Sequence, residues 1–216
     1  MFIGHIAVGL AAKRLAPRTS LGTLLVSAQC LDLIWPIMLL LGWEHVRIDP
    51  GNTVVTPLDF CDYPITHSLL GAAAWSLMLG GIYWLTRRDR RAAWVVGLGV
   101  LSHWILDAIC HRPDLLLLPG GRVKIGLELW NSLAGTLAVE GGFFLGGIIL
   151  FLRTSSARDA IGRYGFWILM AILLILYVGS LFGPPRPSPT VLAWVSLASL
   201  LFVALTYWID HHRQLN

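Results

Sequence analysis

The sequence predicts an all-α polytopic membrane protein with about six transmembrane helices and a short N-terminal half-helix. Hydrophobic residues make up 56% of the 216 residues and charged residues 13%, about half the charged fraction of a soluble protein. Because so much apolar surface would aggregate in water, we expect lipid to be its main solvent. Six apolar runs of 19–25 residues can each cross a hydrocarbon core of ~30 Å. We expect residues 1–216 to form a single membrane-embedded helical domain.

The six runs occupy residues 20–41, 64–86, 92–110, about 128–152, 164–182 and 189–209. Thr19 or Ser20 would cap the first helix, and Pro64 and Pro189 stand at first-turn positions, where the missing N–H costs nothing. The segment of about residues 2–12 is apolar but too short to cross a membrane. It would therefore either dip into the bilayer as a half-helix or lie flat at the interface.

Lysine and arginine residues predict the orientation of these helices. The larger set lies on one side of the alternating runs and comprises Lys13, Arg14, Arg18, Arg87, Arg88, Arg90, Arg91, Arg153, Arg158, Arg163 and Arg213. The opposite set comprises Arg47, Arg112, Arg122, Lys124 and Arg186. Eleven against five places the larger set, and both termini, in the cytoplasm. The net charge of +4 thus reflects orientation and indicates no nucleic-acid partner, so membrane lipid is the partner we expect.

Several ionisable residues lie inside the predicted spans, where each costs at least ~2.5–3.5 kcal/mol. Depth follows from a rise of ~1.5 Å per residue, counted from the nearest cytoplasmic basic residue. The depths are roughly 12 Å for His5, 18 Å for His103, 20 Å for Glu140, 21 Å for Asp32, 24 Å for Asp107 and 30 Å for His67. Most of these residues therefore lie between mid-membrane and the outer face, which indicates one shared cavity. His5 would join them only if its helix dips inward.

The third run carries His103 and Asp107 four residues apart, on one helix face. They are either two metal ligands, a ligand and its orienting partner, or an ion pair that satisfies itself. His111 continues the row at the span end, where we expect an interfacial histidine. In the first run Asp32 precedes Pro36 by four residues, so we expect a kink at residue 32 that either opens an ion site or is merely structural.

The fourth run carries two helical rows. The polar row comprises Glu128, Ser132, Thr136 and Glu140. A row of small residues, which predicts close helix packing, comprises Ala138, Gly142 and Gly146. Glu140 is either a general base, a further metal ligand or a structural hydrogen-bond partner. In and beside the third outer loop, the residues expected to contact substrate are Arg112, Lys124, Glu128 and Asn131. The basic residues of this loop, Arg112, Arg122 and Lys124, could bind an anionic substrate or a lipid head group. The alternative for the basic residues there is that they are solvated loop charges.

Several segments together resemble a family of bacterial inner-membrane proteins described as membrane-bound metal-dependent hydrolases, some of them regulated in the DNA-damage response. They are GHIAVGLAAK, CLDLIWP, YPITHSLLG, SHWILD, HRPDLLLLPG and LWNS. The resemblance covers roughly residues 1–135, and the chain departs from the family pattern in HRPD and in its last two helices. It implies an inner-membrane location and a set of metal ligands: His5, Asp32, His67, His103 and Asp107.

The function we expect is a metal-dependent hydrolase with zinc, because imidazole and carboxylate ligands without thiolate suit this ion, although manganese and iron also fit. Asp32 or Glu140 would take the proton of the attacking water. The depth of the site favours a lipid or lipid-linked ester or phosphoester near the outer leaflet.

Three alternatives stay open. A proton- or metal-ion transporter also uses intramembrane Asp and His residues, but the inner halves of these spans are almost wholly apolar. A b-type haem protein would use His67 and His103 as axial ligands. A scaffold with a structural metal is the third.

The charge distribution generates a topology prediction. A reporter fused at Asn216 should score as cytoplasmic, and a reporter inserted into the loop 43–62 as periplasmic. Paired alkaline phosphatase and fluorescent protein fusions would measure both sites. A periplasmic signal at Asn216 would contradict both the helix count and the depths.

Overall fold

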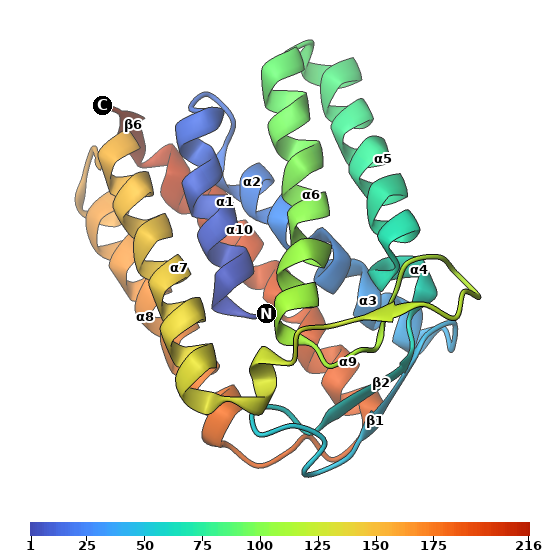
Figure 1. Ribbon diagram of the computed structural model, residues 1–216. Coiled ribbons are helices and arrows are strands. Elements are labelled where there is room, and N and C mark those ends of the chain that lie inside the picture. The colour runs from blue at the N-terminus through green and yellow to red at the C-terminus, as the bar shows by residue number, and fades with distance from the viewer.

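A bundle of membrane-length helices forms the structure, a computed structural model that describes residues 1–216 (Figure 1). Five segments are long and apolar enough to cross a membrane. They are α5 (Leu69–Arg87), α6 (Arg90–Cys110), α7 (Leu133–Thr154), Ile161–Phe182, which ends in α8 (Phe166–Phe182), and Pro189–His211, which contains α9 (Pro189–Leu197) and α10 (Ser199–His211). Counting the bent pair α2 (Leu21–Ala28) and α3 (Cys30–Leu40) as one span gives six. The predicted fold class is confirmed.

Helix α1 (Ile3–Leu15) runs through the interior of the bundle and does not lie flat at its edge. It packs mainly against α7, and also against α2 and α6. Ile3, Ile6 and Leu10 are buried in a hydrophobic core that α2, α7, α8 and α10 complete. The chain start therefore lies in the middle of the molecule (Figure 1), as the dipping half-helix requires.

The first span breaks at Gln29, where α2 and α3 meet at an angle of 57°. The expected kink at residue 32 is therefore wrong in position: α3 continues through Pro36, and Asp32 lies in its first turn. The break exposes the carbonyl oxygen of Ala28, which accepts a hydrogen bond from the His103 side chain. The opened backbone that we inferred from Pro36 thus exists, four residues before Asp32.

Short antiparallel strand pairs close both ends of the bundle (Figure 1). At one end β1 (His45–Ile48) pairs with β2 (Leu58–Asp62), and β3 (Leu115–Leu116) pairs with β4 (Lys124–Ile125). The short helices α4 (Pro64–His67) and η1 (Leu129–Asn131) also lie there. At the other end β5 (Ser155–Ala157) pairs with β6 (Arg213–Leu215), beside η2 (Ile161–Gly165). None of these pairs shows the long alternating pattern by which a sequence predicts strands.

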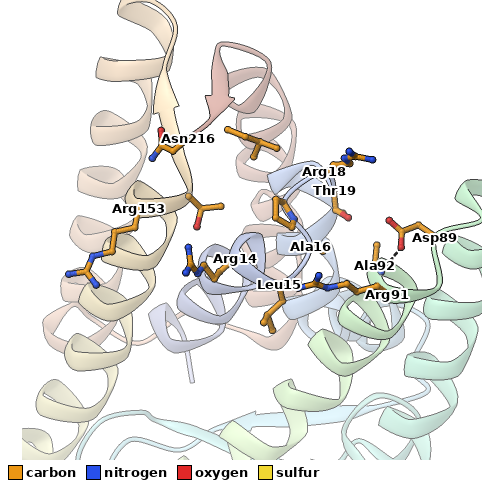
Figure 2. Close-up of a pocket in the computed structure, with 13 residues that line it drawn as sticks. Arg14, Leu15, Ala16, Arg18, Thr19, Asp89, Arg91, Ala92, Arg153 and Asn216 are labelled. Carbon is orange, nitrogen blue, oxygen red and sulfur yellow. Dashed lines mark hydrogen bonds between the residues drawn. The ribbon is translucent and has the colours of Figure 1, made fainter.

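The basic end of the bundle is the end that carries β5, β6 and the α5–α6 turn (Figure 1). A hollow of about 460 Å³ opens there. Figure 2 shows the arginines that line it: Arg14, Arg18, Arg91 and Arg153. All four are exposed and none forms an ion pair. Their gathering at one end agrees with the alternation of loops that the charge count assumes.

Helices α1 and α7 lie in close contact at Gly147. A Cβ atom there would lie 2.6 Å from the carbonyl oxygen and 2.8 Å from the Cα of Ala7. At Gly142 and Gly146, by contrast, a Cβ atom would meet nothing within 4 Å. The row of small residues predicted to pack therefore points away from the neighbouring helices, and the close contact is one residue further along α7.

This contact generates a matched pair of substitutions. Gly147→Val should destabilise the protein by ~2 kcal/mol or more, because the added methyl groups meet backbone atoms that cannot move aside. Gly146→Val should change the stability little, because that position is open. Thermal unfolding of both variants in one detergent measures the difference. Equal losses would mean that α1 does not lie against this face of α7.

Candidate metal centre

Four elements of the fold bring the five expected ligands together. His5 comes from α1, Asp32 from α3, His67 from α4, and His103 and Asp107 from α6. The imidazoles and the Asp107 side chain are at most 4% exposed, whereas the Asp32 side chain is 41% exposed. The centre is therefore enclosed on most sides and open beside Asp32.

Four ligand atoms form a compact group: Asp32 Oδ1, His67 Nε2, His103 Nε2 and Asp107 Oδ2. His67 Nε2 lies 3.6 Å from each of the two carboxylate oxygens. His103 Nε2 lies 3.5 Å from the Asp32 oxygen and 3.2 Å from the Asp107 oxygen. Neighbouring ligands of an ion bound at ~2.0–2.2 Å are roughly 3.3–3.6 Å apart, so these four nitrogen–oxygen separations suit ligands of one zinc ion. The ligand atoms of Asp32, His67 and His103 also lie within 4.8 Å of one another.

The hydrogen bond of His103 prepares its Nε2 to act as a ligand. His103 Nδ1 lies 2.8 Å from the carbonyl oxygen of Ala28, which can only accept, so Nδ1 carries the proton. In the neutral imidazole the lone pair is then on Nε2, which is buried and makes no hydrogen bond, although Asp32 Oδ1 and Asp107 Oδ2 lie 3.5 and 3.2 Å away. A buried polar atom without a partner is costly, and a bound cation would remove that cost.

His67 is oriented by a relay that the sequence did not reveal. Its Nδ1 lies 2.7 Å from Thr66 Oγ1, and that hydroxyl donates to Glu44 Oε2 at 2.6 Å. The hydroxyl proton points to Glu44, so His67 Nδ1 is the donor and Nε2 again carries the lone pair. Glu44 Oε1 also accepts from the backbone N–H groups of Ile65 and Thr66. Thr66 directly precedes a candidate ligand, which is a weak signal, whereas Glu44 is 23 positions from His67 with no recognisable spacing.

His5 approaches the other side of Asp107. Its Nε2 lies 3.0 Å from Asp107 Oδ1, and its ring stacks on His103 with centroids 3.6 Å apart. The amino group of Met1 donates to the same oxygen at 2.5 Å. Thus Asp107 Oδ1 faces α1, and Asp107 Oδ2 faces the four-atom group. His5, His103 and Asp107 form a second possible metal-binding trio that shares two residues with the first group.

Glu140, a residue of α7, lies beside the start of α1. It belongs to neither group of possible ligands. Its Oε2 accepts from the backbone N–H of Phe2 at 2.8 Å and from that of Gly4 at 3.4 Å. Backbone N–H groups at a helix start have no intrahelical partner, and a carboxylate there also stabilises the helix dipole. Glu140 thus contacts the start of α1, and its roles as a general base or metal ligand stay predictions.

The four residues expected to contact substrate lie at the end of the bundle opposite the basic end. Arg112 pairs with Asp59 and lies 3.6 Å from Asp114 Oδ2. Asn131 Nδ2 donates to Glu128 Oε2 at 3.3 Å, and Lys124 lies exposed in β4. None of the four makes a hydrogen bond or ion pair with the five expected ligands. Their contact with substrate stays a prediction.

His111 lies at the end of α6, as expected, but its side chain is buried within the protein. The chain folds back after α6, and the backbone N–H of Glu128 donates to the His111 carbonyl at 2.8 Å. The His111 ring lies between Phe60 and Trp130. Its Nδ1 lies 3.0 Å from Asp114 Oδ1. A fold-back of the loop after a span end is not visible in hydropathy.

The model of one protein family matches almost the whole chain. A family model described as YdjM inner membrane protein matches residues 1–212, so the match extends well beyond the segments that carried the sequence resemblance. No curated protein and no solved structure matches the chain. The family and the apolar helices together show a multi-pass protein of the inner membrane.

The geometry generates a prediction for metal content. Asp107→Asn should lower bound zinc at least ~10-fold, because the substitution weakens a ligand that also orients its neighbours. Asp114→Asn is the matched control, a buried aspartate near the same end of α6 that belongs to neither ligand group. Elemental analysis of detergent-purified protein measures both. Equal zinc in Asp107→Asn and wild type would remove Asp107 from the centre.

Proposed function

We propose that this chain, which belongs to the YdjM inner membrane protein family, is a membrane-embedded metal-dependent hydrolase. The observation that carries the proposal is the four-atom group, in which each imidazole nitrogen lies 3.2–3.6 Å from both carboxylate oxygens, as neighbouring ligands of one zinc ion do. Each of its histidines has the orienting hydrogen bond that metal-binding histidines usually have. The substrate would be a lipid or lipid-linked ester or phosphoester, because the helices around the group cross the membrane.

The residues of the chain have distinct tasks in this proposal. A divalent ion held by Asp32, His67, His103 and Asp107 would act as a Lewis acid, and a water taken up as a further ligand on the open side would become more acidic. The exposed Asp32 carboxylate faces the open side and would accept a hydrogen bond from that water. Glu140 accepts hydrogen bonds from the backbone of α1, so we assign the base role to Asp32 and a positioning role to Glu140.

The geometry favours the hydrolase over the alternatives. Axial haem ligands bind iron from opposite faces of a porphyrin, but here two carboxylates share one compact group with His67 and His103. A transporter needs a polar path toward the cytoplasm. On that side of His5, residues Ile6 and Leu10 of α1 are buried in a hydrophobic core.

Hydrolysis of model esters tests the proposal. Zinc-loaded wild-type protein in mixed micelles should cleave p-nitrophenyl butyrate or bis(p-nitrophenyl) phosphate, and a chelator should abolish the cleavage. His103→Ala should lose at least ~100-fold in rate together with its zinc, since it removes a ligand. Ser102→Ala is the control, because the Ser102 hydroxyl only donates to the carbonyl of Gly99 in its own helix.

Two results would contradict the proposal. Protein without bound zinc, manganese or iron would exclude a metal enzyme. Protein with one equivalent of zinc that cleaves neither ester, nor any lipid of the inner membrane, would instead indicate a scaffold with a structural metal.

A further inference from the structure

Access to the proposed metal centre is possible from one side only. The Asp32 side chain is 41% exposed, whereas His67, His103 and Asp107 are at most 4% exposed. A substrate must therefore approach past Asp32. Asp32 lies at the start of α3, at mid-span and not at a bundle end.

The space in front of Asp32 is an apolar cavity of about 150 Å³. Its walls come from α1, α2, α3, α8, α9 and α10, and include Leu173, Phe202 and Val203. Two of the three hydroxyl groups in the wall are already used, since Ser199 Oγ donates to Ser196 O at 2.6 Å and Thr206 donates to Phe202 O. Apart from the Ser196 hydroxyl, the polar side chains free to meet a ligand are Asp32 and Gln29.

Gln29, one of these two residues, has an unused hydrogen-bonding atom. Its Oε1 is buried and has no hydrogen-bond partner, and most of the residues around it in the cavity wall are apolar. A buried amide oxygen without a partner is costly, so a polar group of a ligand would be held here. The side chain sits at the break between α2 and α3, three residues before Asp32.

A thinly packed seam between α8 and α10 lies between the cavity and the apolar outer surface of the bundle. The two helices touch each other only sparsely. A second hollow of about 410 Å³, almost wholly apolar, lies between them and shares Leu169 with the inner cavity. Both helices expose large apolar side chains such as Ile175 and Leu201, which would face lipid.

We propose that this cavity binds a hydrocarbon chain of the substrate, which reaches the metal centre sideways through the α8–α10 seam. Gln29 binds the polar ester or phosphoester linkage beside Asp32. This inference rests on the proposed hydrolase and deepens it, because it makes the substrate a membrane lipid. The outer hollow extends toward Ala160 and Tyr164, near the basic end. The hydrocarbon chain of the substrate would thus point toward the basic end, which the charge count predicts to be cytoplasmic. A hydrocarbon chain that points in this direction belongs to a lipid of the outer leaflet.

Photo-crosslinking tests this cavity. The full chain is reconstituted in vesicles of phosphatidylethanolamine and phosphatidylglycerol, with a diazirine on one acyl chain of the phosphatidylglycerol, and adducts are located by residue. Leu173 should be labelled, although it is buried. Phe144, which is buried in the closed core, gives the background. Ile175, which is 69% exposed, reports ordinary contact with lipid.

Two substitutions of neighbouring residues sharpen the test. Val203→Trp fills the cavity and should lower Leu173 labelling at least 5-fold, while Ile175 labelling and zinc content stay unchanged. Ala204→Trp faces outward and should change neither labelling. Gln29→Leu should lower Leu173 labelling about 5-fold, which is the loss expected for one neutral hydrogen bond.

Each failure has its own signature. Leu173 labelling no stronger than that of Phe144 in the wild-type protein would overturn the lipid cavity, whatever the zinc content. Equal effects of Val203→Trp and Ala204→Trp would also overturn it. Protein that lacks metal but is labelled at Leu173 would overturn the hydrolase and leave the lipid cavity standing.

Discussion

The carboxylate of Asp107 is the contact on which the arrangement of this protein depends. One of its oxygens lies 3.0 Å from His5 Nε2 and accepts from the amino group of Met1, and so joins α1 to α6. The other lies 3.2 Å from His103 Nε2, within the candidate metal-binding group. Ionisable groups within a membrane are expensive unless they are paired. Asp107 pairs the charges at the start of α1 with those of the candidate centre, and α1 occupies the middle of the bundle.

Broken helices make the rest of the site possible. A straight first span would leave no free carbonyl at Ala28 to fix the tautomer of His103. The break between α4 and α5 at Ser68 places His67 on a separate turn, where Thr66 and Glu44 hold it. Irregular backbone at membrane depth is tolerated where protein buries it or a cavity adjoins it, and both breaks meet this condition. The proposed lipid cavity lies against the first of them.

Most of the fold could be predicted from the sequence, because the hydropathy and length of a segment show directly whether it can cross a membrane as a helix. The depth argument also predicted that His5 would lie near His103, since a short apolar helix held at Lys13 can only point inward or lie flat. The position of the first break could not be predicted, because Pro36 is a visible signal and Gln29 is not. The roles of Glu44 and Asp114 could not be predicted either, because neither residue has a visible signal in the sequence. They lie in connecting segments outside the spans, and only the folding of these segments onto the bundle brings them to Thr66 and His111.

The central claim is that two imidazoles and two carboxylates hold a metal ion inside the membrane. X-ray absorption spectroscopy at the zinc edge, on the purified protein in detergent, tests it most directly. The account predicts nitrogen and oxygen scatterers at ~2.0–2.2 Å, outer-shell scattering from two imidazole rings and no sulfur, because the three cysteines lie outside the group. A sulfur shell at ~2.3 Å, or zinc surrounded by water oxygens alone, would contradict it.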